Sequence, residues 1–199
     1  MAVLVGKHAP DFTATAVLGN NEIKDITFSD VTKGKYAVVF FYPLDFTFVC
    51  PSELIAFNHR LAEFKARNVE VIGVSIDSQF SHLAWKNTPV DKGGIGQVGY
   101  TLVADIKHDI CRAYDVEADA GVALRGSFLI DKNGVVQHQV VNNLPLGRNI
   151  DEMLRMVDAL QFTEEHGEVC PAGWNKGKAG MNASPDGVAA YLAEHAEAL

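Results

Sequence analysis

The segment that most limits the possible fold runs from Tyr36 to Tyr42, where seven consecutive residues are apolar or aromatic. Such a run is apolar on both faces and predicts a central strand that is covered on each side. After Pro43 comes a short loop, and from about Pro51 to Arg67 the apolar residues recur at helical spacing. The chain is therefore expected to pass from a buried strand through a loop into a helix.

Further strands and helices alternate along the chain. Strands are predicted at 69–76, 100–104, 127–131 and 135–141, and helices at 79–86, 109–114 and 150–160. Lys132-Asn133-Gly134 separates the last two strands and is a strong hairpin signal, because Asn-Gly accepts positive φ. Alternating elements with one hairpin predict an α/β fold built on a mixed sheet.

The character of the chain changes over residues 163–199. This region is rich in Gly, Asn and Lys until Ser184-Pro185-Asp186, which predicts a helix start with serine as N-cap and proline in the first turn. Trp174 and Leu192 make the region too apolar for a floppy tail. We predict one domain over 1–162 and, after it, an arm that lies on the domain or reaches a partner.

Charge and hydropathy exclude several classes of function. The net charge of −8 offers no basic surface to a nucleic acid. The longest apolar run, Tyr36 to Leu44, is far shorter than the roughly 20 residues that a membrane helix needs. The first residues have neither the basic region nor the apolar length of a signal peptide. We therefore expect a soluble, cytoplasmic protein that binds neither nucleic acid nor membrane.

The chain has three cysteines, Cys50, Cys111 and Cys170. An odd and sparse set does not resemble a disulfide scaffold, and no Cys-x-x-Cys pair suggests zinc. The seven histidines lack the paired spacing of a metal site. The sequence thus predicts no metal and no cofactor. In a reducing compartment, so few cysteines are either inert core residues or reactive groups.

The surroundings of Cys50 favour reactivity. Because Pro51 suits a first helical turn, Cys50 lies at or beside the amino end of a helix, where the dipole favours thiolate over thiol. That effect is at most ~2 kcal/mol, whereas ionising a cysteine near neutral pH requires roughly 3–4 kcal/mol. The hydroxyl of Thr47 and an arginine could supply the difference. A lone cysteine after a strand is more often inert, but these features together reverse that preference.

Two motifs around the cysteines match a known family. Pro43-x-x-x-Thr47-x-x-Cys50 matches the peroxidatic motif of peroxiredoxins, and Val169-Cys170-Pro171 matches the resolving segment of the typical two-cysteine group. Within that group the chain resembles the bacterial alkyl hydroperoxide reductase C type. The strings FYPLDFTFVCPSEL, GGIG and LRGSFLID extend the resemblance over essentially the whole chain. It implies a thioredoxin-like fold with a mixed central sheet flanked by helices and a C-terminal arm.

The resemblance implies that Cys50 attacks one peroxide oxygen and becomes a sulfenic acid. Thr47 would hold the peroxide, Arg125 would stabilise charge on the leaving oxygen, and Pro43 would shield the thiolate from solvent. A supporting pair is implied at two further positions, Glu53 and Arg148. An ordinary surface salt bridge would look the same in sequence.

The resemblance also implies that Cys170 is the resolving cysteine, supplied by the other protomer of a homodimer. The Cys50–Cys170 disulfide would then cross chains and prevent irreversible oxidation. Local unwinding must accompany it, because both cysteines are held in structure. An external dithiol, either a thioredoxin or a dedicated flavoprotein disulfide reductase, would recycle the enzyme. Cys111 fits neither motif and is predicted to be a buried structural thiol.

Two further expectations concern assembly and inactivation. Residues 45–49 and 77–81 resemble family segments beside a ring contact, so the dimer is expected to form a ring of five dimers. Gly93-Gly94-Ile95-Gly96 resembles peroxiredoxins that excess peroxide inactivates, but the Tyr-Phe pair that usually accompanies it is here Tyr191-Leu192. The degree of sensitivity therefore stays open.

Three other functions compete with a thiol peroxidase that reduces hydrogen peroxide and organic hydroperoxides. A thioredoxin-type oxidoreductase needs Cys-x-x-Cys, whereas this chain has Cys50-Pro51-Ser52-Glu53. A cysteine hydrolase needs a histidine base near its nucleophile, and neither cysteine motif belongs to a hydrolase signature. A ring-forming holdase that binds unfolded chains could coexist with peroxidase activity.

Overall fold

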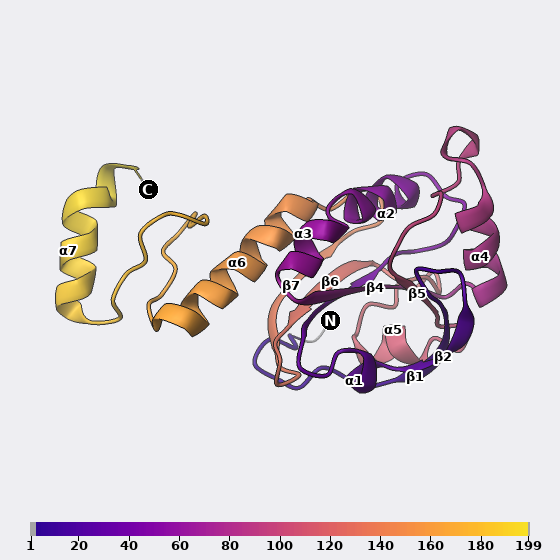
Figure 1. The fold of residues 1–199 in the computed structure, drawn as a ribbon, viewed down its shortest axis with the longest axis horizontal. Helices are drawn as coiled ribbons and strands as arrows, with labels where there is room; N and C mark the ends of the chain where they lie inside the picture. Colours follow the sequence, from indigo (N-terminus) through magenta and orange to yellow (C-terminus); the bar gives the residue numbers. More distant parts are fainter. Residues whose placement is uncertain (1–2, 199) are drawn as a thin grey trace. The chain divides into compact units, whose positions relative to one another are not determined.

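The computed structural model describes residues 3–198, which form two compact units that divide after Ile150. The first unit holds a mixed sheet of seven strands in the order β2-β1-β5-β4-β3-β6-β7 (Figure 1). The strands are β1 Thr13–Val17, β2 Ile23–Thr27, β3 Tyr36–Phe41, β4 Val69–Ser75, β5 Thr101–Ala104, β6 Arg125–Ile130 and β7 Val136–Asn142. Its helices are α1 Phe28–Val31, α2 Cys50–His59, α3 Leu61–Ala66, α4 Gln79–Asn87 and α5 Asp109–Ala113, with a 3-10 turn at Val90–Lys92.

Strand β3 is a buried interior strand of this sheet, next to the middle strand β4, as its apolar sequence predicts. All six of its residues are buried, and it pairs in parallel with β4 and antiparallel with β6. Its side chains alternate between two covered faces: Phe40 stacks on Phe57 of α2, and Phe41 contacts Tyr114 at the end of α5. Figure 1 shows α2 and α3 on one side of the sheet and α1 and α5 on the other. The predicted α/β class with a mixed sheet is confirmed.

One local prediction needs correction. The helix expected over 51–67 is two helices, because Arg60, with φ −96° and ψ 1°, ends α2 before α3 begins. The hairpin predicted at Lys132-Asn133-Gly134 is confirmed, because β6 and β7 pair antiparallel around it and Gly134 has positive φ, at 80°. The Asp131 carboxylate closes this turn by accepting hydrogen bonds from the backbone N–H groups of Asn133 and Val135.

The hairpin of β1 and β2 was not predicted. Its strands read TATAV and IKDIT, which lack the long apolar run of β3. Cross-strand bonds between polar side chains support it, with Thr13 beside Thr27 and the Thr15 hydroxyl donating to Asp25. Antiparallel pairing of β1 with β5 then joins the hairpin to the buried sheet.

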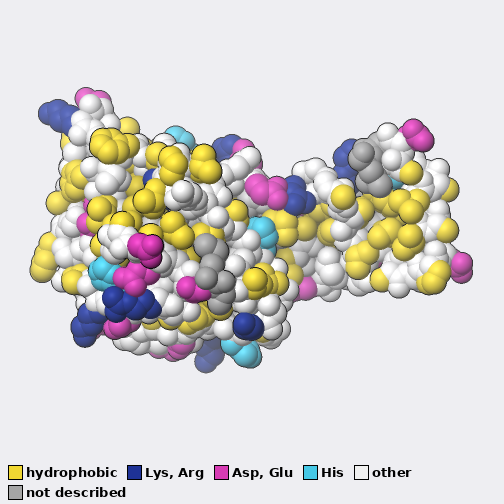
Figure 2. Space-filling view, turned by 180° about the vertical axis from the view of Figure 1, so that it is seen from behind, with side chains coloured by type: hydrophobic (Ala, Val, Ile, Leu, Met, Phe, Trp, Pro, Cys, Tyr) yellow, Lys and Arg dark blue, Asp and Glu magenta, His cyan; other side chains and the backbone are white. Residues whose placement is uncertain are grey.

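The second unit, residues 151–199, contains most of α6 Ile150–His166, an antiparallel bridge between Val169 and Met181, α7 Pro185–His195 and a 3-10 turn Ala196–Ala198. Ser184 caps α7 by accepting a hydrogen bond from the Gly187 N–H, so the predicted cap is confirmed. Figure 2 shows hydrophobic side chains gathered on the visible face of this unit. The boundary predicted after residue 162 lies within α6 and stays a proposal.

No helix among residues 3–198 is long and apolar enough to cross a membrane.

Candidate active site

Helix α2 begins at Cys50, with Pro51 in its first turn, and the loop after β3 leads into it. Cys50 is fully buried. Pro43, at the start of this loop, is also buried. The sequence places the thiol here because a proline tolerates the first helical turn, where its missing N–H costs no hydrogen bond. The thiol therefore lies at the positive end of the helix dipole.

Two polar side chains reach the Cys50 sulfur. The Thr47 hydroxyl donates to Cys50 Sγ over 2.9 Å, and Arg125 Nη1 donates to it over 3.4 Å. Thr47 Oγ1 also lies 2.8 Å from the Leu44 carbonyl. Since a hydroxyl has one proton, Thr47 can donate to only one of these acceptors at a time.

Arg125, the first residue of β6, is fixed by two further bonds. Its Nε donates to the Leu144 carbonyl over 2.6 Å, and its Nη1 donates to Glu53 Oε2 over 2.7 Å. Only 4% of the Arg125 side chain and 2% of the Glu53 side chain are exposed. One guanidinium thus joins the Cys50 sulfur to a buried carboxylate.

Arg148 holds the same carboxylate from the other side. Its Nε and Nη2 donate to Glu53 Oε1 and Oε2 over 2.8 and 2.9 Å, and its backbone N–H donates to Oε1 over 2.9 Å. Nη1 donates to the Gly126 carbonyl and the Ser127 hydroxyl in β6. This bidentate pair is buried and hydrogen-bonded throughout, unlike the surface salt bridge that the sequence left open.

The charges of the two arginines decide whether the Glu53 carboxyl is ionised. Burial raises the pKa of this carboxyl, but the hydrogen bonds and charge of Arg148 and the charge of Arg125 outweigh it and hold the pKa below its usual value. Glu53 is therefore an anion, which lets two guanidinium groups be buried beside it.

The loop before Cys50 is tied down by a second polar cluster. The Asp45 carboxylate accepts bonds from the Tyr42 and Ser81 hydroxyls and lies 2.8 Å from His82 Nδ1. The Asp45 N–H donates to Asp77 over 2.8 Å. None of these side chains is predicted from the sequence to act on the site. A usable signal was present, because Asp45 and Asp77 follow two neighbouring parallel strands whose carboxyl ends meet at one edge.

The other two cysteines have different surroundings. Cys111 is fully buried, and burial, followed by the neighbouring Asp105, raises the pKa of its thiol far above the ordinary value. This favours an inert, protonated thiol. Cys170 lies in the second unit, partly buried, with its Sγ donating to the Ala159 carbonyl over 3.5 Å. All three cysteines are free thiols.

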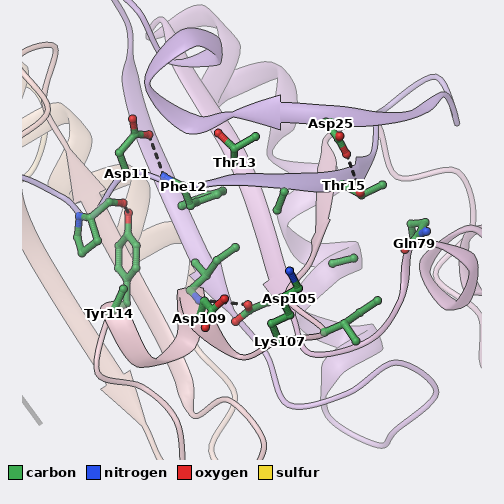
Figure 3. Close-up of a pocket in the computed structure, with 16 residues that line it drawn as sticks. Asp11, Phe12, Thr13, Thr15, Asp25, Gln79, Asp105, Lys107, Asp109 and Tyr114 are labelled. Atoms are coloured by element: carbon green, nitrogen blue, oxygen red, sulfur yellow. Dashed lines mark hydrogen bonds between the residues drawn. The ribbon is translucent and has the colours of Figure 1, made fainter.

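The structure thus brings Thr47, Cys50 and Arg125 together, with Glu53 and Arg148 behind them. A cavity of about 500 Å³ lies elsewhere in the first unit, between β1 and the start of α5 (Figure 3). Tyr114 and Phe12 line it, but none of the seven predicted site residues does. The reactive group and this cavity are therefore separate features.

Comparison with known protein families gives two matches along the chain. Residues 5–139 match the AhpC/TSA family, and residues 159–194 match the C-terminal domain of 1-Cys peroxiredoxin. The first match includes Cys50 and the second includes Cys170.

Individual relatives are similar over nearly the full length. Alkyl hydroperoxide reductase C of Helicobacter pylori is 61% identical over 194 residues, which is 97% of this chain and 98% of the relative. Peroxiredoxin-1 of Gallus gallus is 56% identical over 174 residues, 87% of each chain. The crystal structure of reduced 2-Cys peroxiredoxin from Plasmodium vivax superposes with a TM-score of 0.94 at 52% identity, covering 96% of this chain and 100% of that chain.

Proposed function

The chain belongs to the AhpC/TSA family and is a peroxiredoxin, a thiol peroxidase of the alkyl hydroperoxide reductase C type, and on this premise we propose that Cys50 is the residue that peroxide oxidises. The resemblance and the fold predicted from the sequence are confirmed. One observation supports the assignment of this role to Cys50. At the amino end of α2, the Thr47 hydroxyl and the Arg125 guanidinium both reach the Cys50 sulfur.

In the first step, the Cys50 thiolate attacks one oxygen of hydrogen peroxide or an organic hydroperoxide. An S–O bond forms, the O–O bond breaks, and the leaving oxygen takes a proton to become water or an alcohol. Arg125 stabilises the charge that develops on the leaving oxygen. Thr47, which has a single proton, turns it from the sulfur or the Leu44 carbonyl toward the peroxide.

Glu53 and Arg148 act on this step through Arg125. Glu53 fixes one end of the guanidinium, and Arg148 keeps Glu53 ionised and oriented. Pro43, buried in the loop after β3, shields the thiolate from solvent. Such a supported arrangement holds the donors in place before the peroxide arrives.

In the second step, Cys170 of the other protomer in a homodimer attacks the Cys50 sulfenic sulfur. The S–S bond forms, the S–O bond breaks, and the hydroxide leaves as water with the thiol proton. An external dithiol, a thioredoxin or a flavoprotein disulfide reductase, then reduces the disulfide. A reducing cytoplasm suits this cycle, because it supplies the dithiol.

Non-reducing gels test the pairing of the two cysteines. Protein treated with one equivalent of peroxide should show a covalent dimer that disappears in both Cys50→Ser and Cys170→Ser. Cys111→Ser is the matched control and should keep the dimer, because the Cys111 thiol is fully buried. A dimer band that survives Cys170→Ser and is lost in Cys111→Ser would assign the resolving role to Cys111.

The assembly that we propose is a ring of five dimers, built on aromatic side chains near the site. Phe48 is 97% exposed, Phe80 is 68% exposed and Phe46 is 53% exposed. Phenylalanine side chains are usually buried in the core of a protomer. Phe46 and Phe48 lie in the loop that contains Thr47 and leads to Cys50, so unwinding this loop should weaken the ring contact. Exposed apolar groups of this size favour association.

Analytical sedimentation should find a decamer in the reduced protein and smaller species after oxidation. Phe80→Ser should shift the reduced protein toward dimers, because it removes apolar area from the contact. Ile23→Ser, on the edge strand β2, changes an exposed apolar residue outside both segments and should leave the ring intact. A single dimeric species in both redox states would exclude the ring.

A further inference from the structure

One face of α6 holds the Cys170 thiol. Arg155, Ala159 and Thr163 are spaced four residues apart and therefore lie on one stripe of this helix. Cys170 Sγ lies over that stripe, donating to the Ala159 carbonyl over 3.5 Å and lying 3.7 Å from Thr163 Oγ1. The thiol proton is thus directed at the helix.

Arg155 ties down the turn that follows Cys170. Its Nη1 donates to the Trp174 carbonyl over 2.7 Å, and the Trp174 N–H donates back to Pro171, which closes the turn. Nε and Nη2 of Arg155 donate to the two carboxylate oxygens of Glu152 over 2.6 and 2.7 Å. Two nitrogens of the Arg155 guanidinium are therefore held by Glu152 on the same helix, and the third bonds the turn.

The tryptophan of this turn makes two more attachments. Its ring is 4.8 Å from that of Phe162 on α6, and its Nε1 donates to the Lys178 carbonyl over 3.1 Å. Trp174 is only 3% exposed. The Cys170 turn is thus held by a charged hydrogen bond, a ring contact and the thiol itself.

We propose that Arg155 is a positioning residue that clasps the Cys170 turn to α6, so that release of this turn limits how fast Cys170 forms the disulfide. The proposal rests on the resolving role of Cys170 proposed above. To attack the Cys50 sulfenic sulfur, Cys170 must leave the Ala159 carbonyl and give its proton to the departing hydroxide. While the turn stays bound to α6, Cys170 cannot reach the Cys50 sulfenic acid. A second peroxide can then oxidise the sulfenic acid to the sulfinic acid.

Single-turnover kinetics of Arg155→Gln test the clasp. Disulfide formation should become faster, on the order of tenfold, because a hydrogen bond from a charged donor no longer holds the closed turn. Sulfenic acid formation should keep its rate, and less sulfinic acid should form at high peroxide. Arg155→Lys keeps the charge but loses the fork, so it should behave like Arg155→Gln.

Lys176→Gln is the matched control. It also removes one positive charge from the second unit, but from a 69% exposed side chain whose ion pair with Asp158 measures 3.5 Å. Such a pair contributes little, so the rate of disulfide formation should not change. Hydrogen exchange should show faster exchange at residues 170–174 in Arg155→Gln, with α6 unchanged.

Two results would overturn the clasp. One is an unchanged rate of disulfide formation in both Arg155 variants. The other is a slower rate in Arg155→Gln with its pH profile moved to higher pH, while Arg155→Lys matches the wild type, because then the guanidinium acts through its charge. Failure of the resolving role would look different: Cys170→Ser would still form the Cys50 disulfide in every background.

Discussion

Replacing Cys50 by serine should abolish peroxide reduction completely, whereas replacing Cys170 by serine should leave one fast turnover. A serine hydroxyl is not ionised near neutral pH, and neither Thr47 nor Arg125, the two side chains that reach the Cys50 sulfur, can act as a base near neutral pH. Cys170→Ser keeps this whole arrangement, since Cys170 lies in the other unit. It should therefore consume one equivalent of peroxide per protomer and then stop, because the disulfide proposed as the substrate of the reductant cannot form.

Rapid mixing with excess peroxide and a dithiol reductant measures both quantities at once. The amplitude of the first phase gives the equivalents consumed, and the later slope gives recycling. Cys111→Ser should match the wild type in both phases. An equal loss of the first phase in Cys50→Ser and Cys170→Ser would contradict the assignment of the two roles.

Replacing Arg125 by alanine should slow the first turnover on the order of 10²- to 10³-fold, the usual effect of removing one donor to a developing anion. Arg125 is the only charged donor that reaches the Cys50 sulfur among residues 3–198. Its removal should also lower the free energy of unfolding by roughly 1–3 kcal/mol, because the partly buried Leu144 carbonyl and the buried Glu53 each lose a partner.

Arg125→Lys separates these two effects. Lysine keeps the positive charge but cannot bond the sulfur, Glu53 and the Leu144 carbonyl together, so its rate should fall between those of the wild type and Arg125→Ala. Rates are compared at a temperature where circular dichroism shows each variant folded. A first turnover that stays at the wild-type rate in Arg125→Ala would mean that another cation serves Cys50.

Local chemistry explains which parts of the fold could be predicted from the sequence. The apolar run of β3 predicts a buried strand, and the pair Cys50-Pro51 predicts a helix start. Both β3 and the start of α2 therefore follow from short stretches of sequence. The break at Arg60 has no such signal, since the apolar residues on its two sides continue one helical pattern. The polar strands β1 and β2 are stabilised largely by pairing with each other and with β5.

The site is harder to derive, because its members are far apart in the chain. Arg125 and Glu53 are 72 residues apart, and Arg148 and Glu53 are 95 residues apart. Residue spacing says nothing about such pairs, and only the resemblance to a family connected them. The cluster around Asp45 shows the opposite case, in which the ends of neighbouring parallel strands could have indicated a contact.

The position of Glu53 between two guanidinium groups has a consequence once peroxide has reacted. With Cys50 as thiolate, the two negative groups balance Arg125 and Arg148, and the buried site is neutral overall. In the proposed first step, oxidation turns the thiolate into an uncharged sulfenic acid, which would leave one positive charge unmatched in a region shielded from water. Burying an unmatched charge is costly, so we expect oxidation of Cys50 to weaken the closed site and to favour opening of the first turn of α2. Until it opens, the same charge attracts anions, the hydroperoxide anion as well as a thiolate.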